Sequence, residues 1–180
     1  MNVNPVYLQA KTIAQIQAQS KENALIPNIK LADFFQDDAV KKQFLQATFF
    51  EFTDLLHGQY AFAKVTLDCQ NALGEFLEKV LSVKVTSLDC AVYKLKPGSY
   101  SLLVDDAKPQ TGVDIIFDFT ESFDSRARAE LVYQTPKDLI DIPAHNGVTL
   151  VWKKDARWFF KYMNHYGKER IIGIASITNV

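Results

Sequence analysis

The sequence predicts an α+β protein in which helices come first and pack on a sheet of the sandwich or barrel type. Apolar residues recur at helical spacing within the first 81 residues, and from residue 83 the chain consists of short β-branched and aromatic runs. Helices followed by strands in this order indicate helices layered on one sheet. Turn residues separate the strand-like runs at short intervals, at 97–98, 109–112, 136–137, 143–147 and 164–168.

The composition is that of a single folded domain. The chain has 180 residues, of which 48% are apolar, and this is enough to bury a substantial core. We expect the domain to cover residues 26–180 and a helical arm to cover residues 1–25. Cys69 and Cys90 are too few for a disulfide framework, so we expect two buried free thiols.

Charge and hydropathy argue against two kinds of partner. Lys and Arg total 20 and Asp and Glu total 21, so the net charge of −1 provides no bulk attraction to nucleic acid or to an anionic membrane. The sequence has no run of about 18 apolar residues, so no membrane span is expected. The first 21 residues are polar and rich in glutamine, unlike a signal peptide. We therefore expect a cytoplasmic protein without membrane contact.

Residues 6–20 form the first expected helix. Its apolar residues, among them Val6, Ile13 and Ile16, lie on one thin stripe. The stripe fits two interpretations. Either the helix lies on the edge of the domain, or it is an arm for a partner, through which a homo-oligomer would form.

The next elements follow from local composition. Pro27 biases Ile26 away from the helical region, so residues 26–33 are expected to be extended. Acidic residues at 37 and 38 suit the start of a helix that runs to about residue 47.

Residues 67–81 carry the clearest helical pattern. Residues 49–52 alternate as a short strand does, whereas residues 58–66 are ambiguous. Short strands are expected at 83–85, 89–95, 100–104, 113–119, 129–134, 138–142, 148–152, 157–163 and 171–177.

The stretch from Tyr93 to Asp106 connects two of these strands through a Pro97-Gly98 corner and ends on paired carboxylates. It resembles the strand pair that carries the first two iron ligands in 2-oxoglutarate/Fe(II)-dependent oxygenases of the prolyl 4-hydroxylase and prolyl dihydroxylase type. The likeness continues in order and spacing from about residue 26 to residue 180. It implies a double-stranded β-helix (jelly-roll, cupin-like) with the N-terminal helices packed on one sheet.

The resemblance breaks down at the iron ligands. The family has His-x-Asp where this chain has Val104-Asp105-Asp106, and Phe160 stands about where the family has its distal histidine. Non-haem iron oxygenases need two imidazoles and one carboxylate. Val104 and Phe160 have no lone pair to donate, so Asp106 alone keeps the chemistry of a ligand. We expect no metal, no cofactor and no catalytic residue of the usual kind.

Arg170 stands where the family has the basic residue that holds the 2-oxoglutarate carboxylate. By resemblance, Arg170, Tyr100 and Tyr93 are therefore the candidates for cofactor binding. An unpaired arginine inside an apolar barrel would be costly, so we expect an anion or an acid, such as Asp106 or Glu169, against it.

Several residues leave alternatives open. His57, His145 and His165 could rebuild a metal site, although the first precedes the barrel and the others lie in turns. The Asp105-Asp106 pair could bind a hard cation or a basic peptide, or it could be a solvated strand end. Phe160 could fill space left by the iron site or line an apolar ligand pocket.

Three functional hypotheses follow. The first is a catalytically silent relative of the oxygenases that acts as a binding or interaction domain for a protein or peptide. The second is an active oxygenase with a displaced site, which would use Fe(II), 2-oxoglutarate, Asp106, a histidine and Arg170. The third is a structural protein that assembles through residues 6–20.

Overall fold

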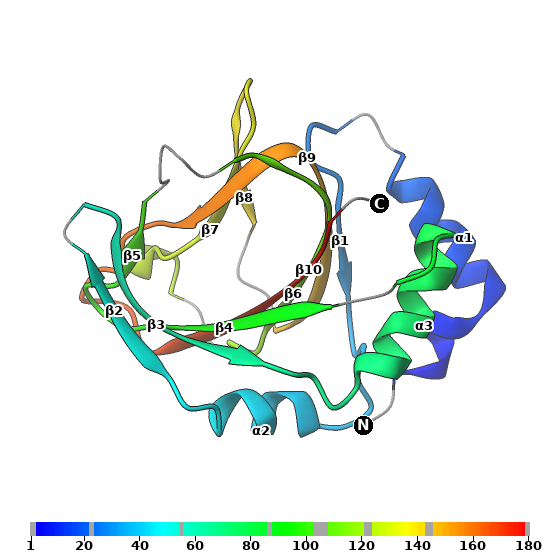
Figure 1. Ribbon diagram of the computed structural model, residues 1–180, viewed down its shortest axis with the longest axis horizontal. Coiled ribbons are helices and arrows are strands. Elements are labelled where there is room, and N and C mark those ends of the chain that lie inside the picture. Colours follow the sequence, from blue (N-terminus) through cyan, green and yellow to red (C-terminus); the bar gives the residue numbers. More distant parts are fainter. Residues whose placement is uncertain are drawn as a thin grey trace.

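Two curved layers of β-strands face each other, and helices cover the outer side of one layer (Figure 1). The computed structural model describes residues 3–21, 24–54, 56–85, 88–102, 108–120, 124–142 and 146–178. This is the α+β double-stranded β-helix predicted from the sequence. The order of strands along the main path is β2-β3-β4-β10-β6-β9-β7-β8, with β1 paired to β9 and β5 paired to β3.

The elements have the following bounds. The helices are α1 Ala10–Gln19, α2 Ala39–Leu45 and α3 Gln70–Leu81, with short 3-10 turns at Pro5–Leu8 and Ser125–Ala127. The strands are β1 Asn28–Leu31, β2 Phe50–Asp54, β3 Gly58–Val65, β4 Asp89–Leu95, β5 Tyr100–Ser101, β6 Gln110–Asp118, β7 Leu131–Gln134, β8 Leu139–Ile142, β9 Gly147–Phe160 and β10 Arg170–Thr178.

Strand β9 belongs to both layers. Its first half pairs with β6 and β1, and its second half pairs with β7. The register with β6 shifts between Gln110 and Gly112, and nearby Asp155 has a positive φ of 52°. A bulge of this kind bends a strand without ending it. The prediction of two separate strands at 148–152 and 157–163 is therefore wrong, because the chain turns from one layer to the other inside one strand.

The corner at residues 97–98 helps to close the barrel. Gly98 N donates to Met163 O, and Met163 N donates to Ser99 O, both at 2.8 Å. Phe160 N donates to Ser101 Oγ at 2.8 Å. Gly98 has a φ of 95°, a conformation that glycine adopts without a steric penalty. These bonds hold the short β5 segment against the end of β9.

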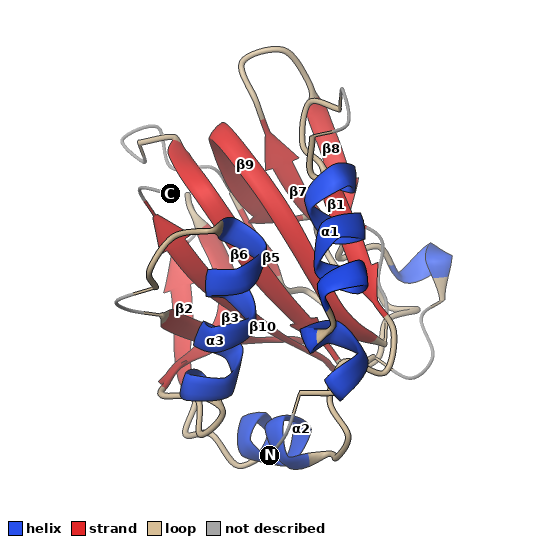
Figure 2. Ribbon diagram, turned by 90° about the vertical axis from the view of Figure 1, so that its right-hand side faces the viewer, coloured by secondary structure: helices blue, strands red, loops and turns tan. Residues whose placement is uncertain are grey.

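Helices α1 and α3 pack side by side on the outer face of the sheet (Figure 2). Ile13 and Ile16 of α1 are buried in the same core as α3. The Gln17 side chain donates to the carbonyl oxygens of Lys79 and Val80, which lie in the last turn of α3. Residues 6–20 thus lie on their own domain, and assembly of a homo-oligomer through them stays a prediction.

Strand alternation separates two cores. On β6, Ile115 and Phe117 belong to the core under the helices, whereas Ile116 belongs to the core inside the barrel. Because successive side chains point to opposite faces, Asp114 and Asp118 share the inner face with Ile116. The barrel interior therefore holds carboxylates as well as apolar groups.

The segment after α3 and the strands β3 and β5 differ from the sequence prediction or complete it. Residues 83–85 form no strand. Ser82 ends α3 with a φ of 57°, and Val85 N then donates to Glu78 Oε1, which holds this segment against the helix. Residues 58–65, part of a stretch that was ambiguous in sequence, form β3, and β5 is shorter than predicted within the described residues.

Cys69 and Cys90 are buried and free, as predicted. Among the described residues, no helix has both the length and the apolar character needed to cross a membrane.

Gly173 offers a test of the outer core. A Cβ at this position would overlap the ring of Phe44, which is fully buried on α2 against Phe117. We expect Gly173→Ala to lower the free energy of unfolding by ~1–3 kcal/mol. The matched control is Gly74→Ala on α3, where the added methyl meets open space, and we expect it to stabilise by ~0.5–1 kcal/mol. Urea denaturation measures both, and effects of the same sign would contradict the packing described here.

Candidate functional site

Three aromatic rings meet inside the barrel. Tyr93 of β4 lies 5.2 Å from Trp158 and 5.3 Å from Phe160, and the two β9 rings lie 5.4 Å apart, measured between ring centroids. Phe160 is 1% exposed. Burial is the main cause that raises the pKa of the Tyr93 phenol well above its usual value. We call these residues the aromatic trio.

A buried polar cluster lies around Asp114 of β6. Lys153 Nζ and Ser176 Oγ both donate to Asp114 Oδ1 at 2.6 Å, and Tyr133 Oη donates to Oδ2 at 2.7 Å. Lys153 Nζ also donates to Gln110 Oε1 at 3.0 Å. The cluster joins strands β6, β7, β9 and β10, and both charges of its ion pair are buried. The positive charge of Lys153 is therefore neutralised by the carboxylate of Asp114.

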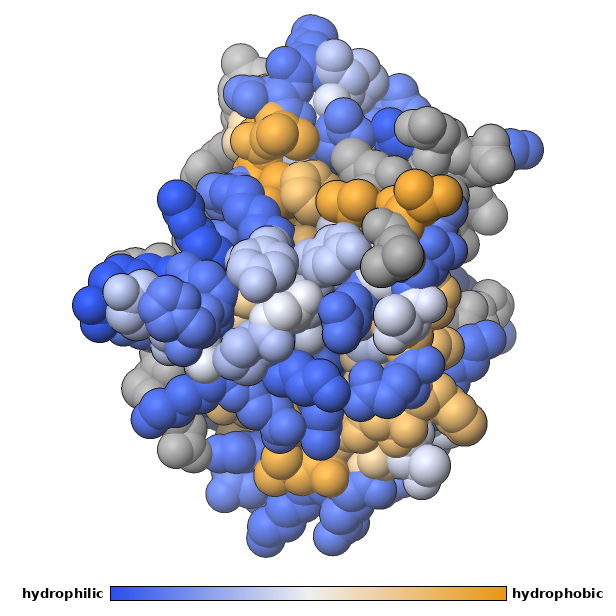
Figure 3. Space-filling model, turned by 90° about the vertical axis from the view of Figure 1, so that its left-hand side faces the viewer, coloured by the Kyte–Doolittle hydropathy of each residue, from blue (hydrophilic) through white to orange (hydrophobic). Residues whose placement is uncertain are grey.

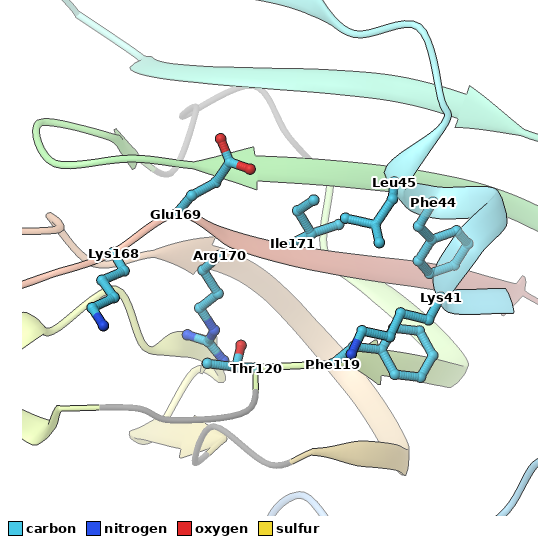
Figure 4. A pocket seen from close by; sticks show the side chains of 9 residues that line it. All are labelled: Lys41, Phe44, Leu45, Phe119, Thr120, Lys168, Glu169, Arg170 and Ile171. Atoms are coloured by element: carbon cyan, nitrogen blue, oxygen red, sulfur yellow. The ribbon is translucent and has the colours of Figure 1, made fainter. Parts of the chain in front are cut away.

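A second ion pair joins β10 to β6. Arg170 Nη2 lies 2.6 Å from Asp118 Oδ2, and Arg170 Nη1 donates to Ala129 O at 2.5 Å. Thr120 N donates to the other carboxylate oxygen of Asp118 at 3.1 Å. In Figure 4, the Arg170 side chain points toward Thr120, whereas the Glu169 side chain points in the opposite direction. The pocket drawn there, about 340 Å³, also has Phe119 and Ile171 in its lining.

A larger cavity adjoins the aromatic trio. Its volume is about 760 Å³, and its lining includes Tyr93, Trp158, Gln110 and Ser176. Tyr93 and Trp158 make an aromatic wall, whereas Gln110 and Ser176 are already hydrogen bonded to the Asp114 cluster. The groups that line this cavity suit recognition by stacking and hydrogen bonding.

The structure brings some of the sequence candidates together. Tyr93 and Phe160 meet in the aromatic trio, and Arg170 lies opposite Leu95, two residues along β4 from Tyr93. Tyr100 lies elsewhere, with its ring 6.4 Å from that of Tyr162. Their assignment to cofactor binding stays a prediction. Val104, Asp105 and Asp106 lie outside the described residues.

An acid lies against Arg170, as expected, and that acid is Asp118. The sequence suggested Glu169 or Asp106 for this role. Glu169 instead pairs with Lys94 at 3.5 Å. The reason is geometric, because Arg170 and Asp118 share the inner face of adjacent strands, whereas successive residues such as Glu169 and Arg170 point to opposite sides.

The described residues do not fit an iron site. Among them, no group of three or more His, Cys, Asp or Glu side chains is placed to hold a metal ion. His57 is in the β2–β3 turn, with Nδ1 2.9 Å from Asp54 Oδ2, and His165 is in the β9–β10 turn against Tyr166. His145 lies outside the described residues. The aromatic trio offers a phenol, an indole and a phenyl ring, and none of these is an imidazole.

Asp114, Asp118, Lys153 and Tyr133 were not among the predicted site residues. A signal was present for the two aspartates, since residues 114, 116 and 118 fall on one face of a strand whose other face is apolar at residues 113, 115 and 117. Carboxylates on the inward face of a central strand require buried partners. No local signal identified those partners, which lie 39 and 52 residues away.

Comparison with known proteins supports the fold. No protein-family model matches the sequence, and no curated protein matches it. Solved structures do match. A 2OG-Fe(II) oxygenase family oxidoreductase from Burkholderia pseudomallei has a TM-score of 0.67 and 12% identity, over 92% of this chain and 90% of that chain. A Pseudomonas putida prolyl-4-hydroxylase has a TM-score of 0.65 and 11% identity, over 92% and 100%.

The chain has the fold of the 2OG-Fe(II) oxygenases. A third structure agrees, a prolyl hydroxylase from Trichoplax adhaerens in complex with a hypoxia inducible factor peptide fragment, with a TM-score of 0.65 and 12% identity over 93% of this chain and 90% of that chain. The resemblance found in the sequence is thus confirmed for the fold. Because one fold hosts many functions, activity has to be argued from the site.

The Arg170–Asp118 pair can be tested by stability. Asp118→Ala leaves a buried guanidinium without its carboxylate, and we expect a loss of ~3–5 kcal/mol in the free energy of unfolding. The double variant Asp118→Leu/Arg170→Met removes both charges, so it should recover most of that loss. Urea denaturation of the three proteins checks this, and a double variant no more stable than the single one would contradict the pairing.

Tyr133 should make stability depend on alkaline pH. Burial, then the nearby charge of Asp114 and the hydrogen bond to it, raise the pKa of this phenol well above its usual value. Above pH of about 10 the unfolded chain loses the proton while the folded chain keeps it, so this contribution is complete below pH 10 and lost as pH rises. The stability advantage of the wild type over Tyr133→Phe should therefore shrink between pH 9 and 11. A constant difference would show that this phenol titrates normally.

Proposed function

We propose that this protein is a catalytically silent relative of the 2OG-Fe(II) oxygenases that uses its double-stranded β-helix as a binding domain for a protein or peptide. The observation that carries the proposal is the aromatic trio. Phe160, taken from the sequence to stand for the distal histidine, is buried against Tyr93 and Trp158. The three rings carry a phenol, an indole N–H and a phenyl group, none of which supplies the imidazole nitrogen that an iron site requires.

The charges inside the barrel support the same proposal. Asp114, Lys153, Asp118 and Arg170 form two buried ion pairs with one another. Asp118 already neutralises Arg170, so a 2-oxo acid bound there would add a second buried carboxylate without a cation of its own. Leaving an uncompensated charge inside a protein costs ~3–5 kcal/mol, which a small ligand would have to overcome.

The fold is compatible with a peptide partner. The Trichoplax adhaerens structure is a complex of a prolyl hydroxylase with a peptide fragment. We infer that the present chain keeps a capacity of this kind on its surface while its interior carries no chemistry. The competing hypothesis, an active oxygenase with a displaced site, requires Asp106 to hold iron with a histidine.

Metal loading and turnover test the proposal. The purified protein is loaded anaerobically with Fe(II), desalted and analysed for metal by mass spectrometry, and 2-oxoglutarate consumption is followed by NMR. We expect iron well below one equivalent and no succinate above the buffer control. One equivalent of iron that is lost in Asp106→Ala, with turnover of 2-oxoglutarate, would overturn the proposal and establish the displaced site.

A further inference from the structure

Strand β2 is an edge strand of the sheet formed by the described residues. It is the last strand in the order, and among the described residues its ladder partner is β3 alone. All five residues, Phe50 to Asp54, pair with β3 in continuous register. An edge strand presents a row of backbone N–H and C=O groups to a further strand, and proteins commonly block such edges with proline, lysine or a bulge. Strand β2 has none of these.

One face of this edge is aromatic. Phe50 and Phe52 lie directly across from Phe62 and Tyr60 on β3, and opposed residues share a face of the sheet. Ring contacts continue inward, since Tyr60 lies 5.0 Å from Phe52 and 5.8 Å from Tyr93. The rings form a ladder from the edge strand to the aromatic trio. Its outermost member, Phe50, is 64% exposed.

The other face of β2 carries one charged side chain, that of Glu51. Glu51 points away from the aromatic ladder, because side chains alternate along a strand. Its carboxylate lies 3.2 Å from Lys96 Nζ, and both side chains are more than half exposed. An exposed pair of this kind contributes little and can be joined or exchanged by another cation.

These residues argue against pairing of β2 with a second copy of itself. Consider two copies of β2 paired antiparallel about a two-fold axis. The register that places Phe50 of one copy opposite Phe52 of the other also places the two Glu51 side chains opposite each other. The next register places Phe50 opposite Asp54. Like charges directly opposite one another are destabilising, as is a carboxylate against an exposed phenyl ring. These two registers of self-pairing are therefore disfavoured.

We propose that β2 takes up an extended peptide strand in which apolar residues alternate with lysine or arginine. The apolar side chains would lie across from Phe50 and Phe52, and a cation would lie across from Glu51. Main-chain hydrogen bonds provide affinity in this mode of recognition, and alternate side chains provide specificity. The inference rests on the proposed function and names the chemistry of the partner.

The surface around the edge fits a narrow ligand. Figure 3 shows the side of the molecule on which β2 and β5 lie in Figure 1. Within the residues that are described, its apolar groups form separate patches among hydrophilic ones. A peptide strand needs only the backbone edge and one row of side chains, whereas a large obligate interface needs a broad apolar area.

Fluorescence anisotropy with synthetic peptides tests the proposal. The probe is fluorescein-labelled Val-Lys-Val-Lys-Val-Lys-Val, and its counterpart carries glutamate in place of lysine. We expect the full-length protein to prefer the lysine peptide by about fivefold, and Glu51→Lys to reverse that preference. The matched control is Glu75→Lys on α3, an exposed glutamate that also pairs with a lysine, and it should leave the preference unchanged.

Backbone methylation separates strand addition from stacking. Two versions of the lysine peptide carry N-methyl groups on either the odd or the even residues. Only one edge of the peptide faces β2, so one version should lose at least tenfold in affinity and the other should bind nearly as the parent does. Equal binding of both versions, or dimerisation of the protein that Glu51→Lys changes, would overturn the proposal.

The outcome is independent of the metal experiment. Peptide binding at β2 requires no group inside the barrel, so it holds or fails whether or not the protein takes up iron. If iron binds and the peptide results are as expected, the proposal that the barrel is catalytically inactive is wrong, and the proposal that β2 binds a peptide is supported. If no iron binds and neither peptide is preferred, the proposal that β2 binds such a peptide is wrong, and the proposal that the barrel is catalytically inactive is supported.

Discussion

Register along β6 is the constraint on which the rest of this structure depends. This strand lies between β10 and β9, and it serves both cores at once. Ile115 and Phe117 face the helices, whereas Asp114 and Asp118 face the interior of the barrel, where each meets a cation from a neighbouring strand. A slip of one residue would reverse every side chain, placing two carboxylates under the helices and a phenyl ring among the buried cations.

The two ion pairs are better understood as determinants of specificity than as sources of stability. Replacing a buried pair with apolar groups of similar size is often neutral or stabilising, whereas breaking it is expensive. The pairs fix β6 against β9 through Lys153 and against β10 through Arg170. A slip of one residue would separate all four of these charges from their present partners.

Much of the fold could be predicted because its signals are local. The periodicity of 67–81 and the apolar run of 89–95 required no knowledge of tertiary contacts, and β4 has the predicted bounds. The continuity of β9 could not be predicted, since it depends on a bulge at Asp155 that resembles a turn in sequence. The partner of Arg170 could not be predicted either. Asp118 is 52 residues distant, and only the antiparallel pairing of β10 with β6 brings the two together.

The aromatic ladder links the filled interior to the open edge. Tyr93 contacts Trp158 and Phe160 on one side and Tyr60 on the other, so the rings of β2 and β3 continue a packed core. Contacts with neighbouring rings restrict Tyr60 and Phe52 in the absence of a partner. Ordering side chains on binding costs ~0.5–1.5 kcal/mol for each flexible group, and rigid aromatic rings largely avoid that cost. The contacts that pack Tyr93 inside the barrel thus also support the rings of β2 and β3, on which the proposed peptide strand would lie.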